Sequence, residues 1–210
     1  MRLSLATPPP ELTALLASGK LWRGQEAPRI AAEASGHARL DALLPGGGWP
    51  KAALSEVLHP QPGTGEMALV LPLLARLSQA EQHIAFVAPP LIPYAPGLAQ
   101  GGVRLDYTLV VQTPNPAESL WASEQLLRSG QAAVLVWADA ASPQGLRRLQ
   151  LAAEESGGMA LLFRSLRRAA EPSPAALRLA VRREHGVPRV QVLKTRGHGG
   201  GHPRPVALGQ

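Results

Sequence analysis

The 210-residue sequence contains no cysteine and few aromatic residues. The absence of cysteine excludes disulfide bonds, a thiol nucleophile and any zinc site built on cysteine. Phe, Trp and Tyr make up only 4% of the chain, too few for the aromatic platforms on which single-stranded nucleic acids usually stack. No apolar run approaches the roughly 20 residues of a membrane helix, and the segment before Pro8 lacks the long apolar region of a secretory leader. The sequence therefore predicts a cytoplasmic protein with no membrane partner, no metal and no cofactor.

Lysine is also scarce, and the positive charge is unevenly distributed. Only Lys20, Lys51 and Lys194 accompany the arginines among the 21 basic residues. Residues 1–146 carry nine basic and eleven acidic residues, whereas residues 147–210 carry twelve basic and four acidic residues, a net charge of +8. This asymmetry predicts an anionic partner for the C-terminal third, either DNA or an acidic protein surface. The alternative is a solvated arginine-rich face, inflated by the codon usage of a GC-rich genome.

Apolar segments alternate with amphipathic ones from residue 53 onward. The predicted strands are Ala53–Leu58, His83–Ala88, Tyr107–Gln112, Ala133–Ala138 and Met159–Phe163, and the predicted helices are Glu66–Gln79, Pro116–Arg128 and Pro143–Ser156. Continuous apolar strands alternating with helices predict an α/β fold with a mostly parallel sheet flanked by helices. Ala176–Arg183 and Arg189–Lys194 alternate in polarity around Gly186 and Pro188, which predicts a C-terminal antiparallel β-hairpin at the sheet edge.

The pattern predicts three regions. Residues 1–45 read as a helical segment with pieces at 11–18, 28–34 and 37–44, and residues 46–196 form the core domain. Residues 197–210 are predicted to be a flexible Gly/His/Arg-rich tail, in which His198 and His202 lack the fixed geometry of a metal site. Trp49, in a Gly/Pro loop, is a candidate partner anchor, whereas Trp137 is expected in the core.

The loop between the first strand and its helix occupies the place where α/β proteins bind phosphate. A phosphate loop reads GxxxxGK[ST], with lysine on the phosphates and a hydroxyl on magnesium. Here the loop contains Gly63, Thr64 and Gly65, followed by Glu66 and Met67 at the lysine and hydroxyl positions. A carboxylate repels phosphate and a thioether is a poor magnesium ligand, so the sequence predicts a degenerate loop with a structural role.

The segments ARLDALLPGGGWPKAALSEVLHPQPGTGE and SGQAAVLVWADA resemble the entry segment and the second nucleotide motif of the RecA/RadA family, with Asp139 at the acid position. SPQGLRRLQLAAEESGGMALLF resembles the helix and strand that follow, so the resemblance spans about residues 36–196. The missing lysine, the arginine-rich C-terminus and the run GTGEMALVLPLLARL are most similar to the ImuA branch. That branch comprises translesion DNA synthesis-associated proteins of bacterial SOS mutagenesis cassettes and is described as similar to SulA.

The resemblance implies a RecA-like fold without catalysis. The family's catalytic glutamate aligns with Pro89 and Pro90, so the chain is expected not to be an enzyme, and Asp139 is expected to be a strand-end or helix-capping residue. The implied function is an accessory protein in SOS-induced translesion synthesis. The implied partners are an ImuB-type inactive Y-family polymerase, an error-prone replicative-type polymerase and RecA, with DNA binding and homo-oligomerisation left open. The alternatives are a SulA-like cell division inhibitor that binds FtsZ and an active RecA-like ATPase.

Basic residues near the C-terminus are the candidates for contact with DNA or a protein partner. Three follow the fifth predicted strand, where RecA-like proteins place DNA-binding loops, and six lie on the hairpin and the start of the tail. They are Arg164, Arg167, Arg168, Arg178, Arg182, Arg183, Arg189, Lys194 and Arg196. Arginine binds phosphates and carboxylates equally well in bidentate geometry, so the residue types leave the partner open.

Overall fold

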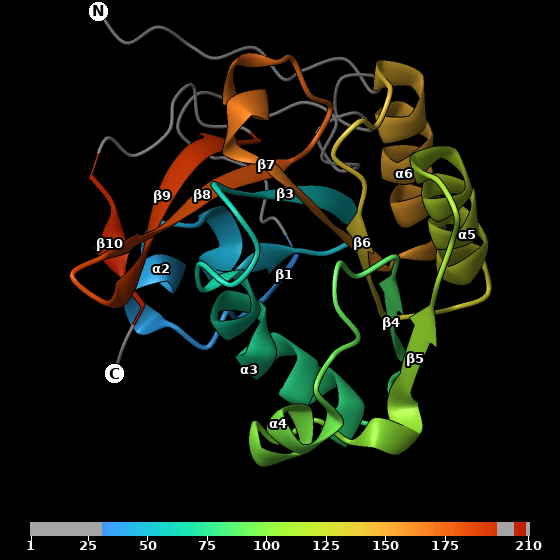
Figure 1. Cartoon of the computed structure of the whole chain (residues 1–210), viewed down its shortest axis with the longest axis horizontal. Helices are drawn as coiled ribbons and strands as arrows, with labels where there is room; N and C mark the ends of the chain where they lie inside the picture. The colour runs from blue at the N-terminus through green and yellow to red at the C-terminus, as the bar shows by residue number, and fades with distance from the viewer. Residues whose placement is uncertain (1–30, 197–203, 209–210) are drawn as a thin grey trace, which may run out of the picture. The chain divides into compact units, whose positions relative to one another are not determined.

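The computed structural model describes residues 31–196 and 204–208, whose main feature is an eight-stranded sheet (Figure 1). Its strands are β3 (Ala53–His59), β4 (Ile84–Val87), β5 (Thr108–Val111), β6 (Ala133–Trp137), β7 (Met159–Ser165), β8 (Leu177–Glu184), β9 (Val187–Thr195) and β10 (Val206–Ala207). They lie in the order β10-β9-β8-β3-β7-β6-β4-β5. All neighbours from β8 to β5 are parallel, whereas β9 is antiparallel to β8 and to β10. The predicted α/β class, mostly parallel sheet and C-terminal hairpin are confirmed.

Helices cover both faces of this sheet (Figure 1). The α-helices are α2 (Ala38–Asp41), α3 (Glu66–Gln79), α4 (Ala95–Gln100), α5 (Pro116–Arg128) and α6 (Pro143–Ser156), and the short 3-10 helices are η1 (Pro45–Gly47), η2 (Leu105–Tyr107) and η3 (Leu166–Ala170). The predicted bounds of α3, α5 and α6 are confirmed. Both α5 and α6 begin with proline after a capping residue: Asn115 accepts the Glu118 N–H at 3.0 Å and Ser142 accepts the Gly145 N–H at 3.1 Å. No helix in the described ranges is long and apolar enough to cross a membrane.

The buried apolar side chains form two layers, one on each side of the sheet. Leu40 of α2, Leu73 of α3 and Leu98 of α4 belong to one layer, and Leu120 of α5 and Leu149 of α6 belong to the other. Successive residues of β6 alternate between the two layers, as a strand buried on both faces requires. Burial of each leucine contributes about 1.5–3 kcal/mol to the free energy of folding. The two layers therefore stabilise the sheet, and a stable sheet fixes the positions of the carboxyl ends of its parallel strands.

The predicted N-terminal helical segment needs correction. Residues Ala32–Glu33 form strand β1, which pairs with β2 (Trp49–Pro50) in a separate two-stranded sheet. Leu44 is buried in the core, so residues 31–45 share the core of the domain that was expected to begin at residue 46. Trp49 is fully buried, so the prediction of an exposed partner anchor is wrong. The helix expected at residues 11–18 lies outside the described residues.

The predicted flexible tail also needs correction at residues 204–208. Val206 pairs with Val190 of β9, and the Leu208 N–H donates to the Pro188 carbonyl at 2.8 Å. Leu208 is buried in the same layer as α3, and this burial fixes the segment in place. Strand β10, and not the predicted hairpin, is therefore the edge strand on this side of the sheet. Residues 197–203, with His198 and His202, lie outside the described residues.

Candidate functional site

The loop that precedes α3 lies at the carboxyl end of β3, where parallel α/β sheets bind their ligands. Gly63 and Gly65 have φ values of 83° and 119°, in the region that favours glycine. These angles turn the N–H groups of both residues toward one point at the start of the helix. In a phosphate loop such N–H groups bind the anion.

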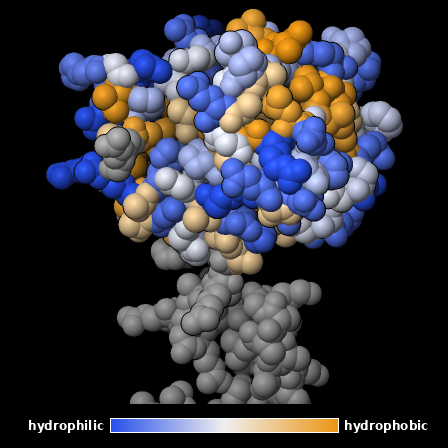
Figure 2. Space-filling view, turned by 90° about the horizontal axis from the view of Figure 1, so that it is seen from below, coloured by the Kyte–Doolittle hydropathy of each residue, from blue (hydrophilic) through white to orange (hydrophobic). Residues whose placement is uncertain are grey.

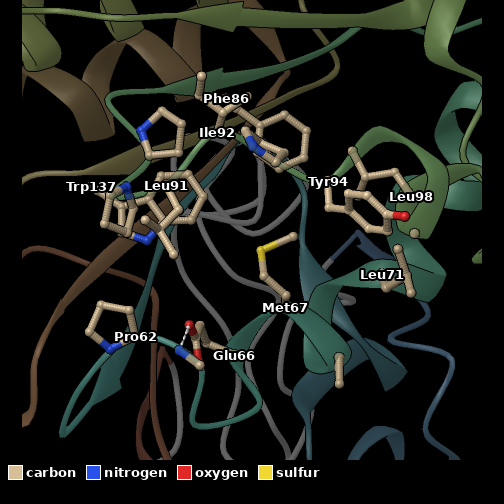
Figure 3. Close-up of a pocket in the computed structure, with 16 residues that line it drawn as sticks. Pro62, Glu66, Met67, Leu71, Phe86, Leu91, Ile92, Tyr94, Leu98 and Trp137 are labelled. Atoms are coloured by element: carbon tan, nitrogen blue, oxygen red, sulfur yellow. Dashed lines mark hydrogen bonds between the residues drawn. The ribbon is translucent and has the colours of Figure 1, made fainter.

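In this chain the anion is supplied by the protein itself. The Glu66 carboxylate accepts the Gly63 N–H at 2.6 Å through Oε1 and the Gly65 N–H at 3.0 Å through Oε2 (Figure 3). The Thr64 hydroxyl donates to the Gln61 carbonyl at 2.5 Å, so it is engaged in holding the turn. Glu66 is 4% exposed, and a carboxylate in the first turn is stabilised by the helix dipole. The loop therefore has the shape of an anion site whose N–H groups are already bound.

An apolar pocket of about 490 Å³ opens beside this loop (Figure 3). It is lined by residues of the loop, of α3, of α4 and of the segment between β4 and α4: Pro62, Gly63, Glu66, Met67, Ala68, Leu71, Phe86, Pro89, Pro90, Leu91, Ile92, Pro93, Tyr94, Gly97, Leu98 and Trp137. Trp137 stacks on Phe163 with ring centroids 4.5 Å apart and forms one wall. Met67 points into the hollow in Figure 3. Where the resemblance would place magnesium and a catalytic glutamate, the structure has a thioether and two prolines.

The segment after β4 carries the most exposed large apolar side chains of the described residues. Leu91 is 78% exposed, Ile92 79% and Tyr94 74%. Sequence reasoning missed this feature because it treated Pro89 and Pro90 only as replacements for a catalytic acid. The sequence does contain a signal for an exposed apolar segment, because no charged residue occurs from Gln82 to Val103, although 17% of the chain is charged.

Asp139, at the end of β6, links two strand ends and a 3-10 helix. Its Oδ1 accepts the Ser165 N–H at 2.7 Å, and its Oδ2 lies 3.3 Å from the Arg168 guanidinium. Burial alone would raise the pKa of Asp139, but the hydrogen bond from Ser165 together with Arg168 and Arg164 lowers it below its usual value. Asp139 is thus a strand-end residue and does not cap α6, whose N-terminal cap is Ser142.

Two of the nine candidate basic residues are inside the fold, which corrects their assignment to a binding surface. Arg164 is 2% exposed and Arg178 6% exposed, and both lie beside Glu56, which is fully buried in β3. Arg178 Nε donates to Glu56 Oε2 at 2.7 Å, and Arg164 Nη1 lies 3.7 Å from Glu56 Oε1. We call these three residues the Glu56 cluster. DNA or a protein partner cannot reach the two guanidinium groups while the cluster is intact.

Four others are exposed to different degrees but already have partners. Arg168 pairs with Asp139 and Glu171, Arg189 with Glu184 at 3.0 Å, and Arg196 with Glu154 at 3.1 Å. The Lys194 ammonium donates to the Ser173 carbonyl at 2.7 Å, and burial beside Arg178 lowers the pKa of Lys194. Within residues 31–196 and 204–208, this leaves Arg167, Arg182 and Arg183 as the candidates that are exposed and have no acidic partner.

These three arginines lie at the end of the sheet that is formed by the carboxyl ends of its parallel strands. We call this region the arginine edge. Arg167 lies in η3, directly after β7, and Arg182 and Arg183 lie near the carboxyl end of β8, which is parallel to β7 through β3. Gly65 of the loop lies against Pro188, the hairpin partner of Arg183. This end of the sheet therefore combines an anion loop that is already filled, an apolar pocket and three arginines that have no acidic partner among the described residues.

Comparisons with known proteins found matches to the same kinds of protein that the sequence motifs resemble. The chain is 32% identical over 134 residues to the protein ImuA of two Caulobacter vibrioides strains, which covers 61% of this chain and 55% of theirs. It is 33% identical over 111 residues to the protein RecA of Bacillus licheniformis, which covers 51% of this chain and 31% of that protein. This chain thus spans about half the length of its ImuA relatives.

A solved structure of SulA from Pseudomonas aeruginosa matches with a TM-score of 0.46 and 28% identity, over 54% of this chain and 98% of that one. No protein-family model matches the chain. The sequence matches are to ImuA and RecA proteins, which the loop and the segment ending at Asp139 resemble. The chain is therefore similar in sequence to ImuA and RecA proteins, as its motifs predicted.

Proposed function

We propose that this chain is a non-catalytic RecA-like accessory protein of SOS-induced translesion DNA synthesis. The observation that carries the proposal is the Glu66 carboxylate on the N–H groups of Gly63 and Gly65. A nucleotide phosphate would have to displace a bound carboxylate and then lie against it, since Glu66 and Met67 occupy the loop positions where a phosphate loop has lysine and a hydroxyl. The similarity to ImuA supports the pathway, and the filled loop supports a role in binding other macromolecules.

The partners proposed are those implied by the ImuA resemblance: an ImuB-type inactive Y-family polymerase, an error-prone replicative-type polymerase and RecA. The surface that supports such contacts is the edge with Arg167, Arg182 and Arg183, which are exposed and have no acidic partner among the described residues. Affinity purification of the tagged chain from cells exposed to DNA damage tests the assignment. Recovery of polymerase-family proteins supports it, whereas recovery of FtsZ without polymerases identifies a division inhibitor instead.

The chain is expected neither to bind nor to hydrolyse ATP at physiological concentrations. Glu66 fills the loop, Met67 cannot ligate magnesium, and Pro89 and Pro90 offer no general base. Titration calorimetry with magnesium and ATP should show no heat of binding, and a phosphate-release assay should show no turnover. The Glu66→Lys variant should remain inactive, because it lacks the magnesium ligand and the base. Micromolar ATP binding, or turnover that Asp139→Ala abolishes, would contradict this expectation.

The three unpaired arginines should provide most of the affinity for an anionic partner. Replacing Arg167, Arg182 and Arg183 with alanine should leave the fold intact, since none of them packs in the core. If DNA is the partner, the slope of log affinity against log salt should fall by about 0.9 on duplex, or 0.7 on single strands, for each phosphate that is no longer neutralised by an arginine. If a protein is the partner, the salt dependence should be shallower and one or two arginines should dominate.

The matched control removes three other exposed arginines, Arg39, Arg128 and Arg147, and thus the same net charge. Fluorescence anisotropy with a labelled oligonucleotide, and binding of the purified polymerase relatives, would be measured for both variants. Equal weakening by the two variants would mean that only net charge matters. Unchanged affinity in both would mean that the arginines are a solvated surface.

A further inference from the structure

The pocket beside the loop before α3 opens onto a face with protruding apolar side chains. Leu91, Ile92 and Tyr94 stand beside a hollow lined by Met67 and Trp137 (Figure 3). Exposed apolar side chains scattered singly are ordinary, but a contiguous group beside a concave apolar surface marks a binding region. The space-filling view in Figure 2, taken from below, shows apolar areas next to strongly hydrophilic side chains on the described part of this side. The apolar surface alone fits any apolar group, so the charges around it decide the kind of partner.

The hairpin of β8 and β9 brings positive charge next to this pocket. Gly63 and Glu66 line the pocket, and Gly65 between them packs against the hairpin, since a Cβ atom at Gly65 would lie 2.7 Å from Pro188 Cβ. Pro188 pairs with Arg183 across the hairpin. Neighbouring strands lie about 4.8 Å apart, so the backbone of Arg183 is one strand spacing from a residue that contacts the loop.

Arg183 is also on the same face of the sheet as the pocket. Side chains of a strand alternate between the two faces, and Val181, two residues before Arg183, is buried in the layer that contains α3. Arg183 is exposed and has no acidic partner among the described residues. Residues 182–189 carry three arginines and one acid, Glu184, whose carboxylate pairs with Arg189. A segment that leaves the pocket toward the hairpin therefore meets positive charge that is not balanced.

This juxtaposition selects among the possible occupants. A second copy of the chain, with net charge +6, or any other basic protein is repelled by the hairpin. Nucleic acid carries a phosphate on every nucleotide, so a base in the pocket would bring negative charge toward Glu66, the only charged residue among those described as lining it. An acidic polypeptide keeps the two apart: its apolar side chains enter the pocket, and carboxylates a few residues along pair with Arg183 in bidentate geometry. We propose, on the basis of the proposed accessory function, that this face binds a segment of a partner protein in which large apolar residues adjoin a run of acidic residues.

Fluorescence anisotropy of the full chain with labelled peptides tests the proposal. Each peptide has about twelve residues, which span about 40 Å when extended. The probe carries two leucines followed by a run of glutamates, and a second probe has the reverse order, with glycine and serine elsewhere. At least one of them should bind with a dissociation constant below about 100 μM, and replacing its leucines with serine or its glutamates with glutamine should weaken binding at least about tenfold. Absence of saturation up to about 1 mM for both probes, or equal binding of the glutamine peptide, would overturn the proposal.

A neutral substitution in the chain tests the apolar part of the face. Leu91→Ser/Ile92→Ser removes exposed apolar side chains without a change of charge and should weaken binding of the probe at least about tenfold. The control Trp121→Ser/Leu151→Ser makes the same kind of change on α5 and α6, on the opposite face of the sheet, where both side chains are exposed. The control should bind like the wild type. Equal loss in both variants, or no loss at 91 and 92, would contradict the role of the pocket.

A charge reversal tests the basic part. Arg183→Glu should weaken binding of the glutamate probe and strengthen binding of a probe with lysines in place of the glutamates. Arg147→Glu, at an exposed position of α6, makes the same change of net charge and should do neither. An equal response of the two variants would mean that net charge alone attracts the peptide, which would overturn the proposal.

Nucleic acid is the alternative that these variants identify. An oligothymidylate of similar charge that binds more tightly than the probes, and that loses affinity in Arg183→Glu but not in Leu91→Ser/Ile92→Ser, would assign the face to nucleic acid instead. The purification of polymerase relatives tests the proposed function separately. Recovery of polymerases without binding of either probe would overturn only the acidic segment, whereas binding of a probe without recovery of polymerases would overturn only the translesion role.

Discussion

Replacing Glu56 with alanine should lower the free energy of unfolding by about 3–5 kcal/mol, the usual cost of removing one partner from a buried ion pair. Glu56 is fully buried in the middle of β3, between β7 and β8. Its carboxylate accepts Arg178 Nε at 2.7 Å and the Ser173 hydroxyl at 2.6 Å. Without it, the guanidinium groups of Arg178 and Arg164 lose their shared buried counter-charge.

The Glu56 cluster also fixes the segment that carries Arg167. Arg178 donates to the carbonyls of Ala169 and Glu171 at 3.0 and 3.1 Å, and Arg164 donates to the Asp139 carbonyl through Nε and Nη2. The bonds of Arg178 hold η3 against the sheet, and those of Arg164 hold the residues that follow β6. Glu56→Ala should therefore weaken binding at the arginine edge as well as stability, although Glu56 itself is inaccessible to a partner.

Urea unfolding at neutral pH measures the loss of stability, with the slope of the transition unchanged if only the native state is affected. If Glu56→Ala fails to fold, Glu56→Gln provides the measurement, because the amide keeps one acceptor for Ser173 or Arg178 and should lose less. Glu184→Ala is the matched control: its pair with Arg189 is partly exposed, and such pairs contribute about 0–1 kcal/mol. A loss below about 1 kcal/mol in Glu56→Ala would contradict the assignment.

The sequence predicted α3, α5 and α6 well because their signals are local, whereas α4 was not predicted. Pro116 and Pro143 follow good capping residues, and the apolar spacing of α5 and α6 continues without interruption to their ends. The strands of the parallel sheet were placed within one or two residues for a similar reason, since they are continuous apolar runs. The register, the strand order and the inclusion of β10 depend on tertiary packing, which a local pattern does not contain.

The buried cations show what a local pattern misses. Arg178 alternates with Leu177 and Leu179 in β8, which is typical of a strand with a solvent face. In the folded chain η3 covers that face, and Arg178 donates to its carbonyls. The hint was Glu56, an acid in the middle of an apolar strand, since a buried carboxylate requires a cation close by.

The candidate site was predicted in part. Glu66 was recognised as a residue that repels phosphate, but the sequence alone did not show that its carboxylate turns back onto the loop. That outcome depends on the φ values of Gly63 and Gly65, which bring both N–H groups within reach of one side chain. The apolar pocket was not predicted, because it is formed by segments that are distant in the sequence.

Replacing Glu66 with alanine should lower the free energy of unfolding by about 2 kcal/mol and create a weak anion site. Hydrogen bonds to a charged group contribute about 1.5–3 kcal/mol each, and competition from water at Gly63, which is an exposed residue, reduces the total. Glu66→Gln keeps one acceptor oxygen and should lose about half as much. Glu81→Ala, at an exposed pair with Arg104, should change stability by less than about 0.5 kcal/mol.

The decisive measurement is the thermal stability of each variant in inorganic phosphate at constant ionic strength. A ligand that binds only the native state stabilises it by RT ln(1 + [L]/Kd), about 1.4 kcal/mol when its concentration is ten times Kd. The midpoint of Glu66→Ala should therefore rise with phosphate, because the N–H groups of Gly63 and Gly65 are free to donate to the anion. The wild type and Glu81→Ala should not respond, because the carboxylate of Glu66 already occupies the loop. A wild type that phosphate stabilises as strongly as Glu66→Ala would show that the loop is open, and the argument against nucleotide binding would lose its main support.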